Sequence, residues 1–440
     1  MKAPTAPTRS DWDKGFAAWR PRIFWILWLT YGAFYLCRQN LSVALPAIGK
    51  EFNWSKAEVG TIGTALFWAY AAGQFVNGQL VDKYGARLIL PVGIIVSALA
   101  NVFIGLTGAL GILTSFMAVW AVNGYFQAMG WPCCIKTLAN WFSPKERGTR
   151  MGIFGASYQV GNVVTWVLAG WLAANVGWRA SFWVPGLIFL AFALITYVGI
   201  RGRPEAVGLP SLEEYEQHVF TGETKTKAAD EEHMGFRYTL SKTVGNPRVW
   251  AVAWSFFFVD VIRYGFMLWA PTYLLETQKA GIDKAAYTSI AMPLFGIPGA
   301  IFTGWATDRF FQSRRAPMVA ILMAILGVLA WSYRFAVPEG AWVLSFLVLG
   351  LIGFCVLGAQ VTLVGAVPMD FGTRKAAASA AGFIDCFGYI GAGLTGVLSG
   401  FLTDKFGWDA AFYFWICSAF ASAAICATLW AYKPPPGKYL

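Results

Sequence analysis

Twelve apolar runs divide this chain, and each is long enough, at about 20 residues, to cross a lipid bilayer as a helix. Charged residues make up only 13% of the chain, roughly half their share in a soluble protein, which argues against a soluble enzyme. We therefore predict an all-α membrane protein with twelve transmembrane helices. The runs lie at about 23–45, 59–80, 88–107, 112–137, 151–173, 180–200, 249–273, 285–306, 316–333, 342–364, 376–400 and 410–431.

A polar stretch separates the first six runs from the last six. It is rich in Glu, Lys and Thr and contains both histidines of the chain, His218 and His233. Such a composition is typical of a solvated connector between two packed units. We predict an N-terminal six-helix half at 1–200, a cytoplasmic linker at 201–248 and a C-terminal six-helix half at 249–440.

Lysine and arginine are distributed unevenly between the two sides that this topology creates. The side that carries both termini and the linker holds 24 of the 34, whereas the opposite loops hold 7. Because cytoplasmic loops of membrane proteins are enriched in these residues, we predict a multi-pass protein of the bacterial inner membrane with both termini cytoplasmic. The net charge of +11 then belongs to loops beside the bilayer, and no nucleic-acid partner is expected.

The seven cysteines all fall in apolar segments, without the spacing of a zinc site or a disulfide framework. We expect them to pack in the membrane domain, with no metal and no cofactor. No small-residue cleavage site follows the charged N-terminus, so no signal peptide is expected.

The two halves repeat one another. Gly78-Gln79-Leu80-Val81-Asp82-Lys83 corresponds to Gly304-Trp305-Ala306-Thr307-Asp308-Arg309 at an offset of 226, and Arg38 with Pro46 corresponds to Arg263 with Pro271 at 225. A third match pairs Gly177-Trp178 with Gly407-Trp408 at 230. Two pseudo-symmetric six-helix halves in parallel repeat resemble the major facilitator superfamily, whose substrate site lies between the halves near the bilayer midplane.

The segment from Gly78 to Arg87 is similar to the signature loop of that superfamily. An aspartate there could cap the N-terminus of a neighbouring helix, or pair with a loop base, in only one of two conformations. The alternative is an ordinary cytoplasmic turn. We predict gating roles for Asp82, Lys83 and Arg87 and for their second-half counterparts Asp308 and Arg309.

Two arginines stand well inside apolar helices, Arg38 in the first and Arg263 in the seventh. A charge near the bilayer centre costs about 2.5–3.5 kcal/mol even on the translocon scale, so both are expected to face a cavity. Two guanidinium forks facing one cavity suit an oxyanion with several acceptors, above all phosphate. The alternative is that each arginine is held in a structural ion pair, for which Asp260 is available to Arg263.

Nearly the whole chain resembles the organophosphate:phosphate antiporter family. The matching stretches are Tyr35-Leu36-Cys37-Arg38-Gln39-Asn40, Gln127-Ala128-Met129-Gly130-Trp131-Pro132, Arg263-Tyr264-Gly265 with Trp269-Ala270-Pro271, and Ser379-Ala380-Ala381-Gly382-Phe383 with Phe387-Gly388-Tyr389. The resemblance implies that Arg38 and Arg263 hold the phosphate group. Tyr31, Tyr35, Trp131, Tyr158 and Tyr389 could line the cavity as donors or stacking surfaces, although among 17 Tyr and 22 Trp any one is more often packing than site.

Several positions depart from the family pattern. Tyr158 stands where the glycerol-phosphate branch has a histidine, and Gln74 replaces a lysine on the second helix. Asp260 and Asp385 are acids at positions where the family usually has none. Asp385 could contact a donor or cation on the substrate, carry a proton or pair with a neighbouring base. Asp260 could contact the substrate or hold Arg263. Lys136 could attract anions or extend to the membrane interface.

We predict a monomeric secondary transporter, not an enzyme, that exchanges an organophosphate for inorganic phosphate by alternating access. Two alternatives stay open. The acids of the cavity would suit a proton-coupled organic-anion symporter, and the hexose-phosphate branch of the family includes a transporter-like sugar-phosphate sensor.

Overall fold

The computed structural model describes residues 9–142, 144–220, 245–279, 281–312, 314–366 and 374–432. Within these ranges the chain is helical apart from short turns. Eight of the described helical segments are long and apolar enough to span a membrane: Ala86–Thr107, Ala180–Gly199, Pro247–Thr277, Ile282–Phe311, Arg315–Phe335, Trp342–Val364, Phe383–Phe406 and Trp408–Thr428. The other four expected spans coincide with helices that are interrupted or carry more polar residues.

The N-terminal half is built from α1 (Arg9–Phe34), α2 (Asn40–Phe52), α3 (Lys56–Tyr84), α4 (Ala86–Thr107), α5 (Leu113–Gln127), α6 (Gly130–Trp141), α7 (Pro144–Asn175) and α8 (Ala180–Gly199). After it come η3 (Pro204–Val207) and α9 (Leu212–Phe220). The C-terminal half comprises α11 (Pro247–Thr277), α12 (Ile282–Ser289), α13 (Ala291–Phe311), α14 (Arg315–Phe335), α15 (Trp342–Val361), a π-helical segment (Thr362–Ala366), α17 (Arg374–Phe406) and α18 (Trp408–Thr428).

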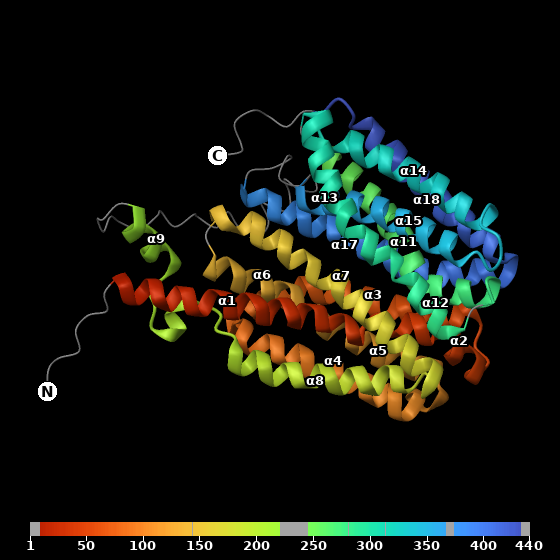
Figure 1. Cartoon of the computed structure of the whole chain (residues 1–440), viewed down its shortest axis with the longest axis horizontal. Helices are drawn as coiled ribbons and strands as arrows, with labels where there is room; N and C mark the ends of the chain where they lie inside the picture. The colour runs from red at the N-terminus through yellow and green to blue at the C-terminus, as the bar shows by residue number, and fades with distance from the viewer. Residues whose placement is uncertain are drawn as a thin grey trace, which may run out of the picture.

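The helices run along one long axis (Figure 1). The start of α1 and α9 lie at one end, which we call the proximal end, while α2 and α12 lie at the other, the distal end. The two halves meet mainly where α3 packs along α17, with further contacts from α2 to α11 and from α7 to α12 and α13. Because Gly60 and Gly396 lack side chains, α3 and α17 approach closely there: a methyl group on Gly60 would collide with the Gly396 carbonyl oxygen.

Two spans of the N-terminal half that were expected to be continuous are broken in the structure. The first, expected at 23–45, ends at Phe34, turns through a short 3₁₀ segment (Tyr35–Cys37) and resumes at Asn40. The fourth, expected at 112–137, is broken between Gln127 and Gly130. Freed backbone groups inside a membrane must find partners within the protein, so these breaks require polar side chains from neighbouring helices.

Those partners are present around the first break. The Cys37 carbonyl oxygen accepts hydrogen bonds from Asn101 Nδ2 at 3.2 Å and from Asn123 Nδ2 at 2.8 Å. The Phe34 carbonyl oxygen accepts one from Gln127 Nε2 at 3.0 Å. All three amide side chains are buried. The break is therefore stabilised by α4 and α5, and it fixes the backbone from which Arg38 projects.

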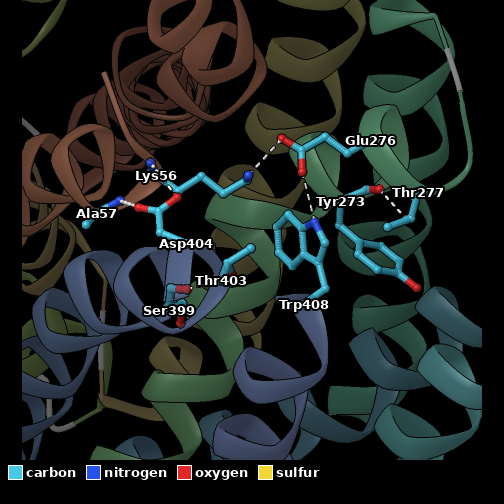
Figure 2. A network of polar contacts seen from close by, with 9 residues as sticks. All are labelled: Lys56, Ala57, Tyr273, Glu276, Thr277, Ser399, Thr403, Asp404 and Trp408. Atoms are coloured by element: carbon cyan, nitrogen blue, oxygen red, sulfur yellow. Dashed lines mark hydrogen bonds and ion pairs between the residues drawn. The ribbon is translucent and has the colours of Figure 1, made fainter. Parts of the chain in front are cut away.

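The distal end is closed by a polar network between the halves (Figure 2). Asp404 of α17 accepts the backbone N–H groups of Lys56 at 3.1 Å and Ala57 at 2.6 Å, the first two residues of α3. The Lys56 ammonium lies 3.3 Å from a Glu276 carboxylate oxygen, and the other oxygen of Glu276 accepts the Trp408 indole N–H at 2.9 Å. Lys56, Glu276 and Asp404 also line a cavity of about 300 Å³ between the halves.

Candidate functional site

Arg38 is buried, with 6% of its surface exposed, at the end of the 3₁₀ segment. Its guanidinium carbon lies 4.4 Å from the Tyr70 ring centroid and 5.0 Å from that of Tyr35. Its Nε donates to Gln127 Oε1 at 3.3 Å. In the described part of the chain no carboxylate pairs with Arg38. It is thus a buried cation surrounded by aromatic rings and neutral acceptors, with its charge uncompensated.

Arg263 is also buried, but it has an acid beside it. It lies in the unbroken helix α11, and its Nη1 is 3.6 Å from an Asp260 carboxylate oxygen one turn earlier. The same nitrogen donates to the Tyr264 hydroxyl at 3.2 Å, and the guanidinium lies 4.6 Å from the Tyr264 ring centroid. Its Nε is buried without a hydrogen-bond partner among the described residues. The two arginines therefore have different surroundings despite their pseudo-symmetric positions in the sequence.

Tyrosine side chains connect the two arginines. Tyr35 interacts electrostatically with both Arg38 and Arg263 and stacks on Tyr158 with 6.0 Å between ring centroids. Across the interface between the halves, Tyr70 of α3 lies 4.6 Å from Tyr389 of α17, and Tyr389 lies 6.1 Å from Tyr264. We call these five residues, Tyr35, Tyr70, Tyr158, Tyr264 and Tyr389, the tyrosine ring.

The structure thus brings most of the predicted site residues into one region. Trp131 packs against Tyr31 at 5.3 Å and Phe154 at 6.0 Å, and no described contact joins it to either arginine. Tyr70 and Tyr264 are members of the ring that sequence reasoning missed as site residues. Tyr264 follows Arg263 directly, which was an available signal, whereas only the three-dimensional packing of α3 reveals Tyr70.

Asp385 is half-buried on α17, one turn before Tyr389. It interacts electrostatically with Arg263 and with Asp260. In the described residues it has no hydrogen bond or ion pair, unlike Asp260. A carboxylate in this position leaves an acceptor free beside the tyrosine ring, which favours a contact with a donor group on a ligand.

The predicted gating residues lie away from the tyrosine ring, near the proximal ends of α3, α4 and α13. The side chains of Asp82 and Asp308 are outside the part that the structure describes. Lys83, Arg87 and Arg309 are exposed. Lys83 lies over the Tyr84 ring at 5.1 Å, and Arg87 donates to the Tyr197 carbonyl oxygen at 3.3 Å.

Sequence reasoning missed the distal network of Lys56, Glu276, Asp404 and Trp408. A signal was nevertheless present, because Gly400-x-x-x-Asp404-Lys405-Phe406-Gly407 has the same spacing as Gly78-x-x-x-Asp82-Lys83-Tyr84-Gly85. In the Gly400–Gly407 copy of this pattern, Asp404 caps the N-terminus of α3, a helix of the other half. Capping of this kind satisfies backbone donors that have no partner within their own helix.

Comparison with known proteins agrees with this architecture. The chain is 32% identical to the glycerol-3-phosphate transporter of Bacillus subtilis, over 96% of this chain and 94% of that protein. It is 29% identical to the membrane sensor protein UhpC of Escherichia coli, over 94% of this chain and 93% of that one. Both alignments cover almost the full length of the two proteins compared.

The fold is also found among solved structures. A bacterial homologue of the human lysosomal transporter Spinster, solved in an inward-facing and unoccupied conformation, superposes with a TM-score of 0.72. At 17% sequence identity over 93% of this chain and 95% of the other, this likeness concerns the fold alone. The profile of the Major Facilitator Superfamily matches residues 27–396. These matches confirm the predicted fold class of two six-helix halves and a transporter-type protein, and the chain belongs to the major facilitator superfamily.

Proposed function

We propose that this chain is a secondary transporter that exchanges an organophosphate for inorganic phosphate by alternating access. The observation that carries the proposal is the pair of buried arginines on opposite halves, with the tyrosine ring around them. Arg38 lacks any described acid. A phosphate dianion can accept hydrogen bonds from both guanidinium groups at once. The similarity to a glycerol-3-phosphate transporter supports phosphate esters as the substrate class.

Substrate binding would close the site because it draws the halves together. Arg38 and the ring member Tyr35 belong to the N-terminal half, whereas Arg263, Tyr264 and Tyr389 belong to the C-terminal half. An empty site would resist occlusion, since a buried arginine without a counter-ion is costly. That penalty makes exchange obligatory, because only a loaded carrier reorients readily.

Closure of the two ends would alternate through the two copies of the glycine–aspartate pattern on α3 and α17. These helices run antiparallel, with Lys56 beside Asp404 and Tyr70 beside Tyr389. The same register brings the end of α3 that contains Asp82 towards the first turn of α17. We assign Asp404 to the distal gate and Asp82, with Lys83, Arg87, Asp308 and Arg309, to the proximal gate.

The topology completes the proposal. The halves at 1–200 and 249–440, joined by the linker at 201–248, would place both termini in the cytoplasm of a bacterium. The proximal end is then cytoplasmic and the distal end faces outwards. The functional unit is one chain with its substrate site between its own halves.

The test is phosphate exchange in proteoliposomes loaded with inorganic phosphate. External glycerol phosphate or a hexose phosphate should release labelled internal phosphate, and the release should continue after a protonophore collapses the proton gradient. Loss of uptake with the proton gradient, and no dependence on internal phosphate, would instead favour the proton-coupled symporter to which the unpaired Asp385 lends support. Binding without any transport would favour a sensor, the function named for the E. coli relative.

A further inference from the structure

Three arginines from separate segments lie at the proximal end of the N-terminal half, with Arg201 between the other two. Arg22 lies on α1, Arg87 in the first turn of α4 and Arg201 two residues beyond α8. Burial lowers the pKa of the Arg201 guanidinium, and the charges of Arg87 and Arg22 lower it further. Arg201 is therefore within electrostatic range of both Arg87 and Arg22, and it shares the Trp19 ring with Arg22. We call Arg22, Arg87 and Arg201 the arginine cluster.

Nothing in the described parts of the chain neutralises this cluster. The described hydrogen bonds of Arg201 run from Nη1 to the carbonyl oxygens of Val198 and Ile200, each at 2.9 Å, and Arg87 donates to the Tyr197 carbonyl oxygen. No carboxylate of the described residues pairs with any of the three. Like charges without a counter-ion raise the free energy of the fold, and an anion bound among them would remove that cost.

An aromatic ring lies near each of the three guanidinium groups. The guanidinium groups of Arg22 and Arg201 lie 4.7 and 5.8 Å from the ring centroid of Trp19. The guanidinium of Arg87 lies 5.1 Å from the Tyr197 ring centroid. Tryptophan and tyrosine concentrate where the membrane core meets the headgroups.

The apolar surface that faces the lipid begins directly beside the cluster. Three residues along the chain from Arg22, Trp25 is 52% exposed, and the neighbours of Arg87 and Arg201 are similarly exposed, with Leu88 at 51% and Val198 at 52%. The arginines therefore border a surface that acyl chains cover, which distinguishes this place from a water-filled cavity. It also contains none of the residues of the tyrosine ring.

We propose that the arginine cluster binds the phosphate headgroup of an anionic phospholipid. The three guanidinium groups supply the donors for the phosphodiester oxygens, and the exposed apolar residues beside them receive the acyl chains. Basic pockets between helices on the cytoplasmic side are a recognised way for proteins to hold such lipids. The site would join α1, α4 and α8, three helices of one half, and leave the interface between the halves free to move.

The test compares lipid binding to the full-length protein in mild detergent, by native mass spectrometry with phosphatidylglycerol and phosphatidylcholine. We expect one phosphatidylglycerol to bind at least tenfold more tightly than phosphatidylcholine. The variant Arg22→Gln/Arg87→Gln/Arg201→Gln should lose this preference. The control variant Arg248→Gln/Arg314→Gln/Arg315→Gln, with the same loss of charge in the C-terminal half, should keep it.

Two outcomes would overturn the proposal. One is unchanged phosphatidylglycerol binding in the cluster variant. The other is displacement of the lipid by millimolar inorganic phosphate or glycerol phosphate, which would identify a site for soluble phosphate. If the triple variant does not fold, the single variant Arg22→Gln decides, because Arg22 is exposed and should still weaken lipid binding several-fold. Phosphate exchange measured on Arg22→Gln, a residue outside the proposed gates and substrate site, separates this result from the proposed function.

Discussion

Arg38 and Arg263 are buried to a similar degree, but their charges are compensated differently. Arg263 has Asp260 at 3.6 Å, whereas Arg38 has only tyrosine rings and the Gln127 amide oxygen. An uncompensated guanidinium gains most from an incoming anion, since the anion repays a desolvation cost that is already present. Arg38 should therefore contribute more to phosphate affinity than its symmetric counterpart.

Replacement of Arg38 tests this difference. Arg38→Lys keeps the charge but loses the planar fork, so phosphate should bind about 10- to 100-fold more weakly, as expected for the loss of one or two charge-assisted hydrogen bonds. Arg263→Lys should have a smaller effect on affinity. The measurement is the half-saturating phosphate concentration for exchange in proteoliposomes, with the exposed Arg203→Lys as control. Near-wild-type affinity in Arg38→Lys would remove Arg38 from the site.

A second prediction concerns the free carboxylate of Asp385. An anion near the site disfavours substrates with an extra carboxylate and favours those with a hydroxyl or ammonium group. Wild type should thus prefer glycerol phosphate, a hexose phosphate or an aminoalkyl phosphonate to phosphoglycerate in competition against phosphate exchange. Asp385→Asn should reduce that preference about tenfold, and so should acidic pH, which protonates the carboxylate.

Asp260→Asn is the matched control for this series. Because Asp260 is paired with Arg263, its loss should weaken all four competitors alike. If phosphoglycerate competes best in wild type and Asp385→Asn leaves the order unchanged, Asp385 does not contact the substrate.

The individual chemistry of most site residues was readable from the sequence, but their surroundings were not. Arg38, Arg263, Asp260 and Asp385 can be identified from the sequence because a charge inside a membrane-spanning segment costs free energy and needs a reason to be there. Whether a buried charge is compensated depends on which side chains of other helices reach it, and this is a property of packing. That is why the sequence alone could not rank Arg38 above Arg263 or find Tyr70.

At the scale of helices, the contact between α3 and α17 determines how the distal end closes. Asp404 caps the first two N–H groups of α3 from the other half, while Ser55 caps the third within its own half. A cap of this kind contributes about 0.5–2 kcal/mol, and the partly exposed Lys56–Glu276 pair adds about 0.2–1 kcal/mol. These contacts are weak enough to be broken in every transport cycle.

Removing the cap should therefore open the distal end. Asp404→Ala should increase the labelling rate of Thr272→Cys, a buried position in the distal cavity, by roughly 2- to 30-fold, since it shifts the equilibrium by the free energy of the cap. The reagent is a membrane-impermeant maleimide added from outside, in a background with Cys417→Ser. Lys50→Gln, which lines the same cavity without a described ion pair, should leave the rate unchanged. Equal labelling rates of the Asp404→Ala and parent proteins would show that the Asp404 cap does not hold the distal end closed.

The close contact between Gly60 and Gly396 offers a second way to test closure of the distal end, by preventing α3 and α17 from approaching. Gly60→Ala adds a methyl group that would collide with the Gly396 carbonyl oxygen. Because that oxygen belongs to the backbone, it cannot move aside as a flexible side chain can. The variant should hold the distal end open, bind phosphate with ordinary affinity and exchange it at least tenfold more slowly. Gly155→Ala, with no atom within 4 Å of the added carbon, is the control. Normal exchange by Gly60→Ala would show that α3 and α17 need not touch there.

The break in the first span could not be predicted from the sequence pattern. The expected break points of helices are proline and glycine, yet no such residue lies between Phe34 and Asn40. The break there persists because Asn101, Asn123 and Gln127 supply the hydrogen bonds that the helix gives up. Apolar runs therefore predict that a segment spans the membrane, and only the neighbouring helices decide whether it does so without interruption.

At the scale of the whole molecule, the two halves meet through a site that contains an uncompensated cation. An unloaded transporter would have to bury that cation without an anion each time it reoriented. Phosphate-loaded proteoliposomes should therefore release labelled phosphate at least tenfold more slowly into buffer than into buffer containing phosphate. Equal release in the two buffers would show that the empty carrier reorients freely.

The charges around the tyrosine ring also have an electrical consequence. In strict exchange the carrier crosses loaded in both directions, so the charges of its own arginines and aspartates cancel over a full cycle and only the difference between the two phosphates remains. Swapping two phosphates of equal charge then produces no current. Swapping a dianion for a monoanion displaces one elementary charge per cycle, worth about 2.3 kcal/mol per 100 mV. The direction of heterologous exchange in such a membrane would respond to voltage, and homologous exchange would not.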